Sequence, residues 1–332
     1  MQSYFPSFTG LLFLILSGQL YAADSLTKQK NELLERIKQV HKYEQQKMDS
    51  LKKVYFSYSS ISQGNPVPTK HPVSSQECLQ STKQGSTFDN PKFEKICKDR
   101  YMAPLYGPEE TADKAKVCID QFEFPNIPCD YPVVWARALT AHEMCEAVGK
   151  RLCDASEWEQ ACAGELDGEQ YVLADPGTSV KTAHGSQRKK INAARKKVWA
   201  YGSSQDHSKC GTNSAKSSGC NKALQTGKSV WKHCGSNTYP SGNFPECKSK
   251  FEVYDQHGNA AEHMNLPLFA GQLTREGSTG HVEMKGSWFI FKKYSAHPDD
   301  CHWRAPYWHG TRLNHPKSHQ NYHLGFRCCK SL

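Results

Sequence analysis

The chain has 332 residues, a formal net charge of +9 at pH 7 and a mean hydropathy of −0.71. This length allows one large domain with an extension or two small domains, and the hydrophobic content of 37 % predicts a soluble protein with much loop. The basic charge suits anionic envelope polymers or phosphorylated lipid headgroups. Nucleic acid is not an expected partner. No DNA-binding motif accompanies the basic cluster Arg188–Lys190 and Arg195–Lys197, which we interpret as a solvated surface loop.

The N-terminus carries the pattern of a secretory signal. An apolar run, Leu11–Leu16, is followed by small residues at Ala22 and Ala23, which predicts a signal peptide over residues 1–23. The basic residues that usually precede such a run are missing. The run is too short for a membrane span, which needs about 20 apolar residues, so no membrane-spanning segment is expected.

The chain contains fourteen cysteines, an even number, and all of them follow this segment. Together the two features predict a periplasmic or secreted protein with disulfide bonds. The alternative is a cytosolic protein with buried thiols or a zinc site. The absence of any tight Cys-x-x-Cys pair weakens the zinc interpretation.

Residues 24–56 are predicted to form an amphipathic helix. Leu33, Ile37, Val40, Met48 and Leu51 approximate a helical stripe that breaks near Glu44. Such a helix can dock on the domain or mediate oligomerisation. Residues 57–115 are interpreted as two parts. Residues 57–76, rich in Ser, Pro and Gly, are a linker, and residues 77–115 are a segment whose Cys78 and Cys97 are expected to form disulfides with the next domain.

Two capping boxes predict two short helices. Thr140-x-x-Glu143 introduces a helix over 141–148 that ends at Gly149. Asp154-x-x-Glu157 introduces a second helix, which carries Trp158, Ala161 and Cys162 on one face and ends at Gly164.

Two strands are predicted towards the C-terminus. Val282, Met284, Trp288 and Ile290 alternate along the first, and Leu324, Phe326 and Cys328 along the second. Between residues 165 and 280 the chain has little periodicity, and we expect Cys210, Cys220, Cys234 and Cys247 to staple its loops.

Five segments, in order, resemble motifs of the formylglycine-generating enzyme (sulfatase-modifying factor) family. They are Cys118–Glu123, Gly149–Glu159 ("GKRLCDASEWE"), Tyr254–Glu262 ("YDQHGNAAE"), Lys285–Trp288 ("KGSW") and Gly325–Cys328 ("GFRC"). The resemblance implies a C-type-lectin-like α+β fold over residues 116–330, with two short helices, short antiparallel sheets and long disulfide-stapled loops. The cysteine content resembles a cysteine-rich branch of the family.

Oxidases of this family hold copper(I) with two cysteine thiolates in a "GGSFxCxxxxC" pattern, and soft sulfur ligands suit that ion. The corresponding residues here are Ile290 and Ser295, which supply no thiolate. Copper is therefore not expected, and Cys301, six residues further on, is predicted to form a disulfide. Whether the chain is an enzyme stays open.

The resemblance also implies a structural calcium site. Its ligands would be the backbone oxygens of Asp255, Gly258 and Ala260 and the side chain of Glu262, a set of oxygen donors that suits calcium. The alternative is a turn that needs no metal. Six histidines near the C-terminus allow a mononuclear iron or zinc site as an enzymatic alternative; they are His297, His302, His309, His315, His319 and His323.

Three functions follow as hypotheses. The first is a binding module that presents the loop 289–323 to an unknown protein or envelope polymer; its candidate ligand-binding residues are Trp303, Arg304, Tyr307, Trp308 and Arg312. The second is a metal-dependent oxidoreductase of the family, using non-haem iron or copper with altered ligands. The third is a structural envelope component that oligomerises through the N-terminal helix.

Overall fold

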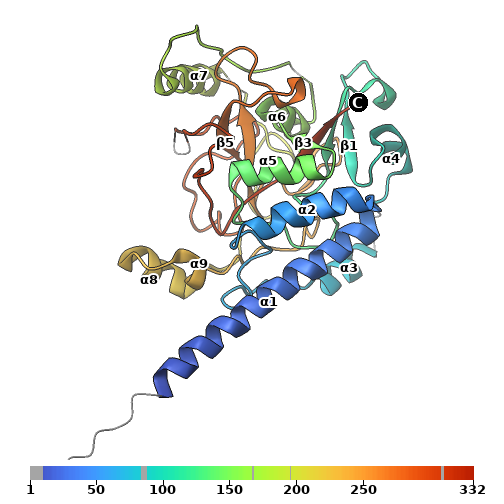
Figure 1. Ribbon diagram of the computed structural model, residues 1–332. Coiled ribbons are helices and arrows are strands. Elements are labelled where there is room, and N and C mark those ends of the chain that lie inside the picture. The colour runs from blue at the N-terminus through green and yellow to red at the C-terminus, as the bar shows by residue number, and fades with distance from the viewer. Residues whose placement is uncertain (1–9, 84–87, 167, 195, 308–309) are drawn as a thin grey trace, which may run out of the picture.

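The computed structural model describes residues 10–83, 88–166, 168–194, 196–307 and 310–332, and it combines helices with short strands (Figure 1). This confirms the predicted α+β class. The α-helices are α1 (Gly10–His41), α2 (Gln45–Ser57), α3 (Ser75–Lys83), α4 (Pro91–Cys97), α5 (Ala138–Ala147), α6 (Ala155–Ala163), α7 (Val180–Ala194), α8 (Ser218–Thr226) and α9 (Val230–His233). Two 3₁₀ turns, η1 (Ala112–Lys114) and η2 (Thr274–Glu276), complete the helical elements.

The N-terminal amphipathic helix forms as two helices, with the break where the sequence pattern fails. Lys42 takes a positive φ of 55° between α1 and α2, so the chain turns back and α2 lies between α1 and α5 (Figure 1). Leu33, Ile37 and Leu51 are buried in a core cluster with residues of α5. The described part of the apolar stripe therefore docks on this chain's own domain, and oligomerisation through the N-terminal helix stays a prediction.

Residues 1–9 of the predicted signal peptide lie outside the described residues, and residues 10–23 form the first turns of α1. Cleavage after residue 23 stays a prediction. Within the described ranges, none of the helices is both long enough and apolar enough to cross a membrane.

Two small sheets organise the domain. The first has the strand order β1 (Met102–Leu105), β2 (Val117–Asp120), β7 (Cys328–Ser331) and β3 (Arg151–Leu152), with every neighbouring pair antiparallel. The second has the order β5 (His281–Lys285), β4 (Ala261–Leu266) and β6 (Leu324–Phe326), in which β4 and β6 run parallel. The C-terminal segment enters both sheets and joins them.

The segment 57–115, which we expected to be a linker followed by a cysteine-containing segment, contributes α3, α4 and strand β1 to the fold. Disulfides Cys78–Cys129 and Cys97–Cys118 tie it to the following segment. The stapling predicted for Cys78 and Cys97 is confirmed.

One capping box is confirmed and the other is wrong. Asp154 and Glu157 cap α6 reciprocally, and Gly164 ends that helix with a positive φ of 70°. Thr140, in contrast, lies inside α5, whose N-cap residue is Arg137. The helix starts earlier because Ser318 Oγ accepts a hydrogen bond from the Ala138 backbone N–H, 3.1 Å away, which satisfies one of the free donors at the helix start.

Both predicted C-terminal strands are shorter than their sequence patterns suggested. Strand β5 ends at Lys285, because Gly286 takes a positive φ of 73° and turns the chain before Trp288. The last strand divides at Arg327, so that β6 and β7 belong to different sheets. The predicted basic surface loop is also partly helical, since the exposed residues Arg188–Lys190 lie on α7.

All fourteen cysteines form disulfides, and no free cysteine remains. The pairs are Cys78–Cys129, Cys97–Cys118, Cys145–Cys328, Cys153–Cys329, Cys162–Cys301, Cys210–Cys247 and Cys220–Cys234. The last two staple the long irregular segment, as expected. The predicted disulfide role of Cys301 is confirmed.

Candidate functional site

A tight turn over residues 254–259 positions a buried histidine at the centre of the domain. Gly258 takes a positive φ of 79°, and a Cβ there would lie 2.8 Å from the backbone of Gly211, so only glycine fits. The Gly258 backbone N–H donates to Ser287 Oγ at 2.8 Å. These contacts fix the turn and direct His257 into the core, where it is 1 % exposed.

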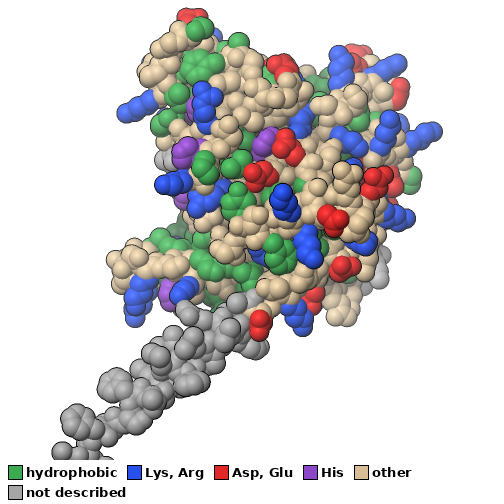
Figure 2. Space-filling model, viewed as in Figure 1, with side chains coloured by type: hydrophobic (Ala, Val, Ile, Leu, Met, Phe, Trp, Pro, Cys, Tyr) green, Lys and Arg blue, Asp and Glu red, His purple; other side chains and the backbone are tan. Residues whose placement is uncertain are grey.

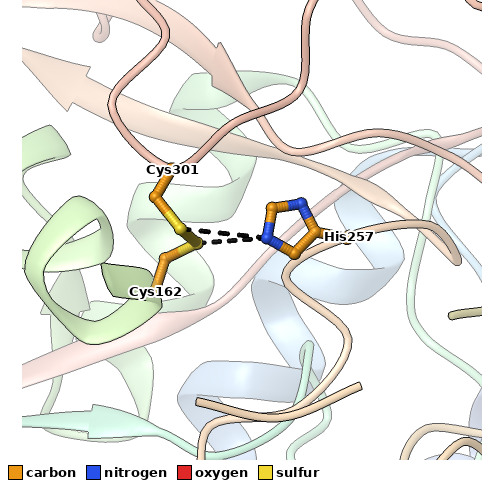
Figure 3. A group of neighbouring side chains, drawn as sticks. All are labelled: Cys162, His257 and Cys301. Atoms are coloured by element: carbon orange, nitrogen blue, oxygen red, sulfur yellow. Dashed lines mark hydrogen bonds between the residues drawn. A yellow bond between two sulfur atoms is a disulfide. The ribbon is translucent and has the colours of Figure 1, made fainter. Parts of the chain in front are cut away.

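His257 faces a disulfide (Figure 3). Its Nε2 lies 3.3 Å from Cys162 Sγ and 3.8 Å from Cys301 Sγ, and these two sulfurs are bonded to each other. The same Nε2 accepts a hydrogen bond from the Ala200 backbone N–H at 3.0 Å. The lone pair of Nε2 is therefore occupied, and the sulfurs are not thiolates.

The other side of His257 faces Asp299, a buried carboxylate. Asp299 Oδ1 accepts hydrogen bonds from Trp199 Nε1 at 3.0 Å and Gln205 Nε2 at 2.8 Å, and Oδ2 accepts from Ser287 Oγ at 3.0 Å. Two ring nitrogens approach the same Oδ2: His257 Nδ1 at 3.9 Å and His207 Nε2 at 4.0 Å. Both nitrogens are buried without a hydrogen-bond partner.

The electrostatics of this group keep the carboxylate charged and His257 neutral. Burial lowers the pKa of His257 to about 4, against the opposing attraction of Asp299. Burial alone would raise the pKa of Asp299, but the interaction with His257 and the three hydrogen bonds outweigh it and hold this pKa below its usual value. Near neutral pH the group therefore presents a carboxylate and an unprotonated imidazole.

Two imidazole nitrogens and one carboxylate are a donor set that suits iron(II) or zinc(II). His207, His257 and Asp299 supply such donors by residue type, but they are not among the groups of described residues whose three ligand atoms lie within 4.8 Å of one another. Because His257 Nε2 accepts from Ala200, the proton of the neutral ring lies on Nδ1, the nitrogen that faces Asp299. The groups that do place three ligand atoms together are Cys162, His257 and Cys301, and Cys153, Glu157 and Cys329. In both of these groups the sulfurs are consumed in a disulfide.

The residues predicted to bind calcium lie at a neighbouring buried cluster. Glu262 is 1 % exposed, and its oxygens accept from Arg327 Nε and Nη2, both at 2.7 Å, and from Trp158 Nε1 at 3.0 Å. The arginine thus occupies the carboxylate that the prediction assigned to calcium. Gly258 lies in the turn that leads to this cluster, and Ala260 is the residue before β4.

The same cluster contains two more buried carboxylates. Glu123 accepts from Ala260 N, Ser241 Oγ and Asn259 Nδ2, and Asp255 accepts from the Gly242 backbone N–H. Burial raises the pKa of Glu123 well above its usual value, and the charges of Asp255 and Glu262 raise it further. Three carboxylates around one arginine need either protons or a further cation. Calcium at Asp255, Gly258, Ala260 and Glu262 stays a prediction.

Asp255 predicts a measurable pH dependence of stability. Burial raises its pKa to about 7, despite the hydrogen bond from Gly242 and the charge of Arg327. The folded protein therefore keeps a proton that the unfolded chain loses near pH 4, so this contribution to stability falls as the pH rises from about 4 to about 7. The variant Asp255→Asn removes the contribution, and asparagine tolerates the positive φ of 57° at this position.

Denaturant unfolding of both proteins between pH 4 and pH 8 measures the effect. The difference in unfolding free energy, wild type minus variant, is expected to fall with a slope approaching about 1.4 kcal/mol per pH unit, and to level off above pH 7. Comparing the two proteins cancels the opposite trend of His257, whose lowered pKa makes stability fall towards acid pH. Parallel pH profiles would show that Asp255 is ionised throughout the folded state.

The candidate ligand-binding loop is mostly buried. Arg304 is fully buried and pairs with Glu283 and with Glu159, the latter at 2.9 Å, so it belongs to the core and not to a displayed surface. Trp303 is 4 % exposed and stacks on His297, with ring centroids 4.3 Å apart.

Other residues of the loop do reach the surface. Tyr307 is 38 % exposed, Tyr294 is 54 % exposed, and Arg312 is exposed. Trp308 lies outside the described residues, so its place in the proposed surface stays a prediction.

The positions that correspond to the copper cysteines lie in the segment after β5. Ile290 is buried, whereas Ser295 is exposed and its hydroxyl donates to the Phe291 carbonyl at 3.0 Å. Cys301 does not stand in for either, because it is bonded to Cys162 on α6. The residues present do not fit a copper(I) dithiolate centre.

His207, His257 and Asp299 were missed as site residues from the sequence. Within the described residues, the predicted C-terminal histidines join no group of three metal-ligand side chains. Only the position of His257 inside the "YDQHGN" motif gave a signal. Asp299 and His207 are 92 residues apart in the chain, and no local pattern connects them.

Fold and site together define a disulfide-stapled α+β domain that carries the motifs of a sulfatase-modifying factor but not its copper ligands. The family model of the sulfatase-modifying factor enzyme 1-like domain matches residues 69–332, and the chain belongs to this family. The match starts inside the segment that we expected to be a linker.

Comparison of the sequence with curated proteins gives no significant match. Among solved structures, the chain is similar to PvdO from Pseudomonas aeruginosa, with 14 % sequence identity, a TM-score of 0.34, and coverage of 70 % of this chain and 91 % of that one. It is also similar to CarF, with 11 % identity, a TM-score of 0.26, and coverage of 70 % and 96 %.

Proposed function

We propose that the chain is a binding protein of the sulfatase-modifying-factor family, without formylglycine oxidase activity, that works in a periplasmic or extracellular environment. One observation carries the proposal: every cysteine is held in a disulfide, while Ile290 and Ser295 stand where the oxidases hold copper. The oxidases of the family hold copper(I) through cysteine thiolates, and soft sulfur ligands suit that ion. A chain whose cysteines are all paired in disulfides has no thiolate to offer.

The oxidising location is supported by the seven disulfides, which persist outside the cytosol. They also give long loops the rigidity that a recognition surface needs, because a pre-ordered surface loses less conformational entropy on binding. Exposed Tyr294, Tyr307 and Arg312 are contacts that such a surface offers to an envelope polymer or a protein.

Copper(I) titration and oxygen consumption test this function. The natively oxidised protein is expected to take up no stoichiometric copper and to consume no oxygen with a cysteine-containing peptide. The double variant Ile290→Cys with Ser295→Cys serves as the matched positive control, since it restores the two thiols at the family positions. One tightly bound copper per wild-type chain, together with oxygen uptake, would contradict the proposal.

A second function, a metal-dependent oxidoreductase, is favoured by the meeting of two histidines, His207 and His257, with the buried carboxylate of Asp299. These residues would hold iron or zinc, and a bound iron would supply redox chemistry. A metal inventory of the purified protein, compared with His207→Ala and with the exposed control His315→Ala, decides this. Metal lost only in His207→Ala supports the second function, and a metal-free wild type removes it.

A further inference from the structure

A cleft of about 760 Å³ lies beside the helices α8 and α9, and its lining does not include His207, His257 or Asp299. Its walls come from residues 68–72, residues 213–219, the end of α9 and the segment after β5. This volume lies within the range of ordinary small-ligand sites.

The described side chains that line the cleft carry positive charge and no negative charge. Lys70, Lys216, Lys232 and Lys293 line it together with two histidines, and among the described residues that line it there is no Asp or Glu. A second cleft of about 770 Å³, at the turn between α1 and α2, is also rich in lysine, but Glu44, Glu94 and Asp99 line it as well. Of these two clefts, the first is therefore the one whose described lining favours an anionic ligand without opposing carboxylates.

The absence of acidic side chains extends along all the segments that form the cleft. Residues 57–76, 207–245 and 284–298 contain no Asp or Glu, although 33 of the 332 residues are acidic, about one in ten. On the face shown in Figure 2, the projecting lobe that corresponds to α8 and α9 carries Lys or Arg and His side chains and no acidic one. These segments therefore supply no acidic side chain that would offset the lysines, and Asp130, whose charge reaches the lining residue His71, is itself paired with Arg36.

The walls of the cleft are fixed to one another. Disulfide Cys220–Cys234 joins α8 to the residue after α9, immediately beside the cleft residues Gly219 and His233. The Lys70 backbone N–H donates to Asn237 Oδ1 at 2.7 Å, and the Ser214 backbone N–H donates to the Phe289 carbonyl at 2.7 Å. Binding would therefore cost little ordering of the backbone.

We propose that this cleft binds an anionic glycan, a sugar chain that carries sulfate, phosphate or carboxylate groups; the inference rests on the proposed binding function and names its ligand class. Lysine ammonium groups act as point charges for such anions. Exposed Asn213 and Ser218 offer polar groups to sugar hydroxyls. Among the described lining residues there is no Phe, Tyr or Trp on which a nucleic-acid base could stack, so a glycan is favoured over a single strand.

Titration calorimetry with the natively oxidised full chain tests the proposal. The probes are sulfated dextran fragments, phosphorylated mannan fragments and oligogalacturonate, with neutral dextran and a single-stranded oligonucleotide for comparison. The wild type is expected to bind at least one anionic glycan and not neutral dextran, with affinity that falls as salt increases. The anionic probe that binds most tightly identifies the group recognised.

Two charge-matched triple variants locate the site. Lys70→Gln, Lys232→Gln and Lys293→Gln together should weaken binding about tenfold. Lys42→Gln, Lys95→Gln and Lys98→Gln, in the other cleft, lose the same charge and should bind within about twofold of the wild type. All six lysines are exposed, so neither variant disturbs the core.

Three results would overturn the inference: equal losses in the two triple variants, tighter binding of the oligonucleotide than of any glycan, or no binding of any anionic glycan by the wild type. None of these three results contradicts the proposed function if the protein also binds no copper and consumes no oxygen. Oxygen consumption with the cysteine peptide would instead count against the proposed function.

Discussion

The variant Arg304→Met is expected to lower the free energy of unfolding by about 3–5 kcal/mol. Arg304 is fully buried and, with Lys285, neutralises Glu159 and Glu283, which are equally buried. Removing the guanidinium leaves an excess of negative charge in the core, and taking unpaired charge out of water costs several kcal/mol. Denaturant unfolding at neutral pH measures the loss.

Arg312→Met is the matched control for this prediction, because it removes the same side chain from an exposed position on the same loop. Its effect on unfolding should stay within about 0.5 kcal/mol. Adding Glu283→Gln to Arg304→Met should recover part of the loss, since it restores the charge balance. Equal effects of the two arginine variants would mean that Arg304 reaches solvent and can serve the recognition surface after all.

Breaking the disulfide between Cys145 and Cys328 should destabilise the protein by about 5 kcal/mol, the largest loss expected for any of its covalent links. This disulfide has a sequence separation of 183 and joins α5 to the start of β7. Because a disulfide restricts the unfolded chain more when it closes a longer loop, the entropic contribution grows with that separation. The double variant Cys145→Ser with Cys328→Ser avoids leaving an unpaired thiol.

The control for this prediction is the double variant Cys220→Ser with Cys234→Ser, which opens a loop with a separation of only 14. The same relation gives a loss of about 3 kcal/mol. Thermal and denaturant unfolding of the two variants should preserve this order. A larger loss from the short loop would show that local packing, and not restriction of the unfolded chain, dominates the stabilisation.

The parts of the fold that follow from local chemistry were predictable from the sequence. The capping box at Asp154 and Glu157 and the break between α1 and α2 each follow from neighbouring residues. The pairing of all cysteines was indicated by their even number. The resemblance of five motifs to the family then predicted the α+β architecture, which the structure and the family match confirm.

The pairing of side chains distant in the chain was not predictable. Arg304 belongs to a loop whose composition is typical of a recognition surface. It is nevertheless buried, because it forms ion pairs with Glu159 on α6 and Glu283 on β5. Likewise, Asp299 meets His207 and His257 only through the tertiary fold. Charge and aromatic content of a loop give no information on which of its side chains find partners in the core.

The central claim is that sulfur in this protein staples loops and holds no redox metal. The most direct measurement is alkylation of the denatured, unreduced protein after gentle isolation, followed by mass determination. The account predicts no alkylated cysteine, and fourteen after reduction, because all fourteen are paired. Two or more cysteines that react before reduction, at Cys162 and Cys301 above all, would contradict it.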